Sequence, residues 1–102
     1  MGTLFIVATP IGNLKDITFR AVEILNNVEI ILSENTRISK VLLKKYNIST
    51  RLISYNDHNH KKKIIKILEI LKTSDIALIT DAGTPGISDP GSQLVLEARK
   101  ND

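Results

Sequence analysis

Four short apolar runs, each followed by a segment with helical spacing, place the strongest constraint on how this chain can fold. The runs cover residues 4–8, 29–33, 52–55 and 76–80. Strands that alternate with helices indicate a parallel sheet with crossover helices, and apolar runs without polar alternation indicate that both sheet faces are covered. The pattern therefore predicts an α/β fold, a three-layer sandwich with a mainly parallel sheet.

The helices are predicted from the spacing of their apolar residues. Asp16 is the expected cap of the first helix, the second follows Arg37 and ends near Asn47, and the third follows a polar stretch at 56–63. A fourth helix is expected over about 92–100. The residues expected to face inward on the first three helices are Ala21, Ile24, Leu25 and Val28; Ile38, Val41 and Leu42; and Ile64, Ile65, Ile67, Leu68 and Leu71.

The composition narrows the classes of function. The 102 residues include no cysteine, which excludes disulfides, thiolate zinc sites and cysteine nucleophiles. A net charge of +3 is compatible with an RNA partner without requiring one. No apolar segment approaches the length of a membrane span, and the first run is too short and lacks the preceding basic residues of a signal peptide. We therefore expect a cytoplasmic protein with no membrane association.

The segment 81–91, DAGTPGISDPG, is the strongest candidate for a ligand-binding loop. With the segments 9–16, 33–37 and 56–60, it is expected at the carboxyl edge of the sheet, where open α/β sheets bind ligands. Its glycines let a ligand approach the main chain, and Pro85 and Pro90 stiffen it. It lacks Lys and Arg, and Asp81 and Asp89 would repel phosphate. The hydroxyls and positive charges of S-adenosylmethionine suit this loop better than a phosphate.

The other edge segments leave alternatives open. The first loop, ATPIGNLKD at 8–16, is equally consistent with a capped structural turn and with a ligand contact. In SENTR at 33–37, an ion pair between Glu34 and Arg37 is the favoured interpretation of that pair alone. The functional interpretation has Arg37 hold an RNA phosphate and Glu34 orient a nucleophilic hydroxyl.

The segment YNDHNH at 55–60 contains three candidate metal ligands, Asp57, His58 and His60. Close spacing in a coil-to-helix segment is weak evidence for a metal, and none is expected. A solvated loop, or an RNA-contacting loop backed by the lysines at 61–63, is favoured instead.

Four segments of the chain resemble a family of methyltransferases that act on small-subunit ribosomal RNA, within the tetrapyrrole-methylase-like superfamily. They are LFIVATPIGNLKDIT at 4–18, SENTR at 33–37, ISYNDHN at 53–59 and ALITDAGTPGISDPG at 77–91. The resemblance implies 2′-O-methylation of a cytidine in 16S rRNA, with S-adenosylmethionine as donor, and a homodimer. It also implies that 1–102 is the N-terminal α/β domain of the tetrapyrrole methylase fold, with the C-terminal domain absent from this chain.

Motif matching supplies the cofactor-binding candidates Pro10 and 83–88, whereas Asp81, Glu34, Arg37 and His58 are candidates because of the chemistry of their own segments. Glu34 is the catalytic candidate, and Arg37 and His58 are RNA-binding candidates. The cofactor-binding candidates are Pro10, Asp81, Gly83, Thr84, Pro85, Ile87 and Ser88.

Two departures from the family pattern matter. Asn35 stands where the family usually has Asp, and family members are more than twice as long, so we expect the chain alone to be inactive or nearly so. Two other interpretations remain. One is a superfamily methyltransferase acting on a tetrapyrrole or a protein, and the other is a non-catalytic RNA- or cofactor-binding module.

Overall fold

The sheet consists of parallel strands in the order β1-β4-β2-β3. In this computed structural model, which describes residues 2–9, 17–81 and 89–100, the strands are β1 (Leu4–Thr9), β2 (Ile30–Ser33), β3 (Arg51–Ser54) and β4 (Ile76–Asp81). The prediction of a parallel sheet is confirmed, with each strand within one residue of its expected bounds. β4 comes last of the four in the chain but lies between β1 and β2.

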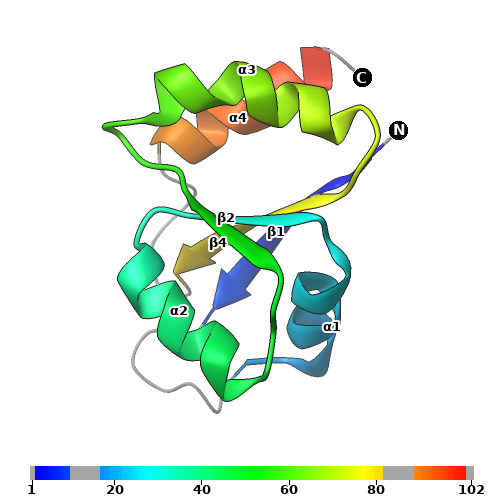
Figure 1. Cartoon of the computed structure of the whole chain (residues 1–102). Coiled ribbons are helices and arrows are strands. Elements are labelled where there is room, and N and C mark those ends of the chain that lie inside the picture. Colours follow the sequence, from blue (N-terminus) through cyan, green and yellow to red (C-terminus); the bar gives the residue numbers. More distant parts are fainter. Residues whose placement is uncertain (1, 10–16, 82–88, 101–102) are drawn as a thin grey trace.

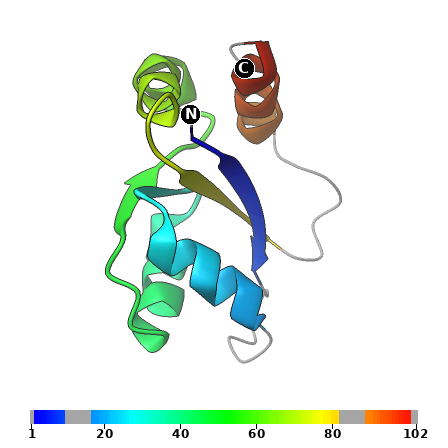
Figure 2. The same ribbon diagram turned by 90° about the vertical axis from the view of Figure 1, so that its right-hand side faces the viewer.

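Helices cover both faces of this sheet. α1 (Phe19–Asn27) and α2 (Thr36–Lys45) pack on one face, and α3 (His60–Leu71) and α4 (Asp89–Lys100) lie on the other (Figure 1; Figure 2). The central strand β4 serves both layers, because Ala77 and Ile79 join the core under α1 and α2 whereas Ile76 and Leu78 join the core under α3 and α4. The predicted three-layer sandwich is thus confirmed.

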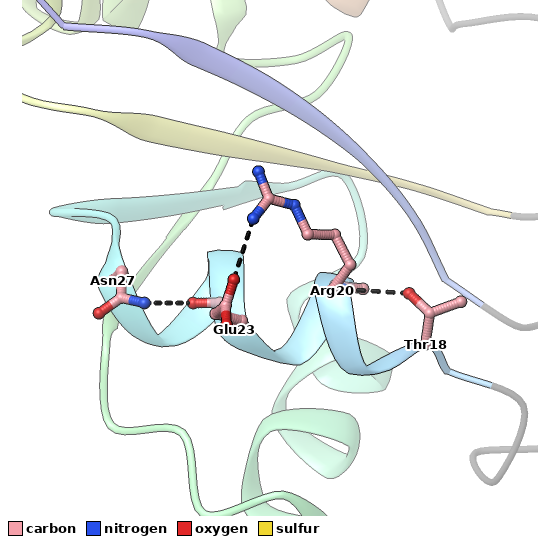
Figure 3. Close-up of polar contacts among 5 residues, drawn as sticks. Thr18, Arg20, Glu23 and Asn27 are labelled. Carbon is pink, nitrogen blue, oxygen red and sulfur yellow. Dashed lines mark hydrogen bonds and ion pairs between the residues drawn. The ribbon is translucent and has the colours of Figure 1, made fainter.

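The start of α1 differs from the prediction. Thr18, not Asp16, is the N-cap residue: its backbone is extended, and its side-chain oxygen accepts a hydrogen bond of 3.1 Å from the Ala21 N–H. Figure 3 shows this cap together with the exposed pair of Arg20 and Glu23, 2.9 Å apart. Asp16 itself lies outside the described residues. Thr18 is placed three residues before Ala21, the spacing that a capping side chain needs.

The buried face of α2 also differs from the prediction. Ser39, Leu42 and Leu43 are buried, whereas Ile38 and Val41 are 56% and 57% exposed, so their expected inward placement is wrong. The buried face of the helix includes the polar residue Ser39. Apolar spacing alone therefore predicted a buried face shifted by one residue. The end of the helix is as predicted, because Asn47 adopts a positive φ of 56° that reverses the chain.

The two remaining helices need smaller corrections. Ile67 and Leu71 are buried and Ile64 and Leu68 pack against the same core, but Ile65 is 73% exposed and does not face inward. α4 begins at Asp89, three residues before its expected start at 92, so the end of the 81–91 segment is helical. Among the helices described, none is long and apolar enough to span a bilayer.

Candidate functional site

The carboxyl ends of the strands meet at one edge of the sheet, as the parallel order requires. Ser33 at the end of β2 pairs with Ser54 at the end of β3, and Thr9 of β1 pairs with Asp81 of β4. The starting points of the four expected edge segments therefore lie at the same edge. The other cofactor-binding candidates lie outside the described residues: Pro10, Gly83, Thr84, Pro85, Ile87 and Ser88.

The turn that connects β2 to α2, here called the β2 turn (residues 33–39), is held by a short chain of hydrogen bonds. The buried hydroxyls of Ser33 and Ser39 lie 2.6 Å apart. The Asn35 N–H donates to Ser33 Oγ at 3.2 Å, and Asn35 Oδ1 in turn accepts from the Ile38 N–H at 3.4 Å. Asn35 is thus the N-cap of α2. Asp and Asn are comparable N-caps, so this structural role does not require a carboxylate at position 35.

Glu34 and Arg37 both lie exposed on this turn. The ion pair favoured from their spacing is not formed, since the described residues include ion pairs only of Arg20 with Glu23 and of Lys100 with Glu97. The reason is local: Glu34 precedes the N-cap, so it does not share a helical surface with Arg37 as two residues three apart within a helix would. Both side chains extend from the edge into solvent.

The turn that connects β3 to α3, here called the β3 turn (residues 54–63), is more densely bonded. Ser54 Oγ accepts hydrogen bonds of 3.1 Å from the side-chain amides of both Asn56 and Asn59. The Lys63 ammonium donates to the Ser54 carbonyl at 2.6 Å, and Asn59 Oδ1 accepts from the Asn56 N–H at 2.9 Å. The polar composition of this segment is therefore mostly structural, which the expectation of a solvated or RNA-contacting loop did not include.

The two histidines of the β3 turn have different environments. His60 is buried, donates from Nδ1 to the Asn56 carbonyl at 3.1 Å, and meets the Tyr55 ring edge-on with ring centroids 6.1 Å apart. Tyr55 is completely buried, and this burial raises the pKa of its hydroxyl above the usual value. His58 is exposed, so it is accessible to a partner. No group of three or more His, Asp or Glu residues in the described ranges is arranged to hold a metal ion.

A cavity of about 610 Å³ lies away from this edge, near the amino-terminal end of β1. It lies beside the amino-terminal half of β1, where Gly2, Leu4 and Ile6 face Leu71 of α3 and Ala98 of α4. Its position at the opposite end of β1 from Thr9 separates it from every predicted site residue that the structure describes. We therefore base the site on the chemistry of the strand ends and not on the size of this cavity.

Sequence reasoning missed the residues that hold the two turns. Ser39 and Ser54 make key hydrogen bonds there, yet neither was a candidate, and Lys63 was expected only as part of an exposed or RNA-contacting run. A signal existed for Ser39, because a serine at a helical position flanked by Leu42 and Leu43 on one stripe needs a buried partner. No sequence pattern identified Ser54, because its partners Asn56, Asn59 and Lys63 reach it only after the chain turns at the end of β3.

Comparisons with known proteins agree on one family. The family model described as Tetrapyrrole (Corrin/Porphyrin) Methylases matches residues 3–102. Proteins named ribosomal RNA small subunit methyltransferase I are similar to the chain. The one from Mycoplasmopsis pulmonis is 50% identical over all of this chain and 46% of its own length. The one from Thermotoga maritima is 54% identical over 95% of this chain and 44% of its own. The chain thus spans less than half the length of these curated relatives.

Solved structures show the same fold at low sequence identity. A diphthine synthase superposes with a TM-score of 0.73 at 18% identity, covering 98% of this chain and 41% of its own. A uroporphyrin-III-C-methyltransferase from Thermus thermophilus superposes with a TM-score of 0.68 at 16% identity, covering 97% and 43%. At such identities the likeness concerns the fold alone.

Proposed function

Because this chain belongs to the tetrapyrrole (corrin/porphyrin) methylase family, we propose that it forms the N-terminal domain of an S-adenosylmethionine-dependent methyltransferase of small-subunit ribosomal RNA. The observation that carries the proposal is the level of identity, about half of all residues over nearly the whole chain, to relatives named for that substrate. The likeness to a diphthine synthase and a porphyrin enzyme supports only the fold, so it does not favour those substrates. The proposed target is the 2′-hydroxyl of a cytidine in 16S rRNA.

The described strand ends suit the cofactor. S-adenosylmethionine supplies a methyl group on a positively charged sulfur, together with a ribose diol and an ammonium group. Thr9, Thr80 and Asp81, at the adjacent ends of β1 and β4, carry oxygen atoms and no cation. Pro10 follows β1 in the sequence and the proposed cofactor residues 83–88 follow β4, whose last residue Asp81 pairs with Thr9. Asp81 and the segment after it are therefore proposed to hold the ribose and the charged groups.

The protein's main task in such a methyl transfer is to align the ribose oxygen with the methyl carbon and the sulfur. The hydroxyl must also lose its proton, and a nearby carboxylate can accept it. Glu34 fits this role, since it is exposed and follows β2, the neighbour of β4 at the carboxyl edge. We assign proton acceptance to Glu34 and phosphate contact to Arg37, with His58 as a second RNA contact on the adjacent β3 turn.

A pair of glutamates at the two ends of β2 provides a matched test. Glu34→Gln in the full-length protein is expected to slow methyl transfer about 100-fold, because a general base contributes on that scale. Its affinity for S-adenosylmethionine, measured by calorimetry, should be unchanged. Glu29→Gln, which neutralises another exposed carboxylate at the opposite end of β2, should leave turnover unaltered. If the Glu34→Gln variant turned over as fast as the Glu29→Gln variant, Glu34 would not act as the proton acceptor.

The substrate is tested separately. Full-length protein, labelled S-adenosylmethionine and undermethylated small ribosomal subunits should yield label in 16S rRNA, in a cytidine ribose. Absence of label there would favour a tetrapyrrole or protein substrate.

The 102-residue chain alone should be inactive and bind S-adenosylmethionine weakly, and tight binding would contradict the idea that the site needs a second domain. A homodimer in the cytoplasm is the proposed working form, which light scattering and cell fractionation would test.

A further inference from the structure

The positive charge of the chain is distributed unevenly. Residues 34–45 and 57–66 contain eight of the 14 Lys and Arg residues but only two of the 11 Asp and Glu residues. The rest of the chain has an excess of carboxylates, six basic against nine acidic residues. The modest net charge of +3 therefore conceals a strongly basic region within an otherwise acidic chain.

This region covers α2, the amino-terminal half of α3 and the turns that precede the two helices. The two helices begin where β2 and β3 end, and these ends are joined by the pairing of Ser33 with Ser54 and by a 2.9 Å hydrogen bond from the Tyr55 N–H to the Ser33 carbonyl. In Figure 1 both helices start on the side of the molecule to which β2 runs. The exposed cations near these helix starts are Arg37 and Lys40 on α2 and Lys61 and Lys62 on α3, here called the basic edge. Lys63 is half-buried and bonded to the Ser54 carbonyl, so it is not included.

The basic edge has no evident role in stabilising the fold. All four side chains are exposed, and none pairs with a carboxylate among the described residues. Neither helix has an acidic residue in its first turn. Arg37, Lys61 and Lys62 lie in these first turns, where a cation opposes the helix dipole, whereas Lys44 and Lys45 in the last turn of α2 complement it. Exposed cations that do not stabilise their own helices are available to bind a partner outside the domain.

We propose that the basic edge is a docking surface for the phosphate backbone of the RNA substrate, placed on both sides of the sheet edge that presents Glu34. The proposal rests on the function proposed above. Four cations without a carboxylate partner in the described part of the chain match a polyanion, and Arg and Lys are among the groups that bind phosphates and fix the register of a nucleic acid. An RNA strand is favoured over an acidic protein because these cations border the turn that carries Glu34, where a ribose hydroxyl must be presented. Cations on α2 and on α3 would then hold phosphates on either side of the reacting nucleotide.

Charge-matched variants of the full-length protein test this assignment. One variant neutralises the basic edge: Arg37→Gln, Lys40→Gln, Lys61→Gln and Lys62→Gln. The control removes four exposed cations from the opposite ends of the same layers: Lys45→Gln, Arg51→Gln, Lys72→Gln and Arg99→Gln. Affinity for undermethylated small subunits and for single-stranded RNA is measured at several salt concentrations, with thermal unfolding and S-adenosylmethionine affinity as checks on the fold.

The basic-edge variant should bind RNA at least tenfold more weakly than the unmodified protein and bind S-adenosylmethionine equally well. Its slope of log affinity against log salt should fall by roughly 3, because each lost phosphate contact on a single strand removes about 0.7. The control should keep most of its affinity and slope. Equal losses in both variants, or unchanged RNA affinity in the basic-edge variant, would overturn the proposal. Failure of the unmodified protein to methylate small-subunit RNA would instead count against the proposed function.

Discussion

The β2 turn and the β3 turn lie side by side at the same edge of the sheet, yet they use their polar residues differently. In the β3 turn, Ser54, Asn56, Asn59 and Lys63 bond to one another inside the turn, and the exposed polar side chains are those of Asp57, His58, Lys61 and Lys62. In the β2 turn the internal bonds come from two serines and Asn35, which leaves the charged side chains of Glu34 and Arg37 in solvent.

This difference separates residues that build the edge from residues that act at it. A polar side chain that is half-buried and bonded to its own turn is expected to matter for stability. An exposed charged side chain on the same turn is expected to matter for binding or catalysis and to be nearly neutral for stability. Three sets of substitutions, ordered by the expected size of their effect, test whether the two turns divide in this way.

The largest effect is expected at Asn59. Asn59→Ala removes the acceptor of the Asn56 N–H and a donor to Ser54 Oγ, so it should lower the free energy of unfolding by about 2 kcal/mol. Urea denaturation of the full-length protein measures this loss. The neighbouring variant His58→Ala is the control, because that side chain is exposed, and it should change stability by less than about 0.5 kcal/mol. Equal effects of the two would mean that the β3 network is not what holds the turn.

A smaller effect is expected at Ser39. Ser39→Ala deletes one half of the buried hydroxyl pair and leaves Ser33 Oγ with only its hydrogen bond from the Asn35 N–H, which should cost about 1.5 kcal/mol in the free energy of unfolding. Ser49→Ala, at an exposed position just beyond the end of α2, should be close to neutral in the same urea titration. If Ser39→Ala were as stable as Ser49→Ala, the hydroxyl pair would not contribute to the β2 turn.

The smallest effects are expected at Asn35. Asn35→Ala should cost about 1 kcal/mol by removing the N-cap acceptor, whereas Asn35→Asp should stay within about 0.5 kcal/mol of the original protein. Thermal unfolding of both variants gives this difference. The rate of methyl transfer by the Asn35→Asp variant then tests whether a carboxylate at this position takes part in the reaction. A rise in turnover without a change in stability would show that a carboxylate at this position acts in the reaction and not only as a cap.

Much of the fold was predictable because its signals are local. The apolar runs identified all four described strands, and their lack of polar alternation matched a sheet covered on both faces. The inward faces of the helices were less predictable. Ile38 and Val41 are exposed because the buried stripe of α2 runs through Ser39, whose burial depends on a hydroxyl partner in β2. Apolar periodicity cannot detect a polar residue that is buried by a contact from another element.

The candidate site was predictable to a different extent. The position of the edge followed from strand order, and Glu34, Arg37 and His58 are exposed there, as residues that meet a partner must be. The structural use of Asn56, Asn59 and His60 was not foreseen. Their hydrogen bonds depend on how the chain turns after β3, and a polar composition alone fits either a solvated loop or an internally bonded one.

The central position of β4 affects how the domain assembles during synthesis. The ribosome releases β1 first, but the hydrogen bonds of β1 within the described sheet are to β4, which emerges about seventy residues later. β2 and β3, close in the chain, can pair as soon as both are free. The backbone of the apolar strand β1 therefore stays without its sheet partner until β4 inserts between β1 and β2. The nascent chain is thus exposed to chaperones and proteases for as long as that insertion is delayed.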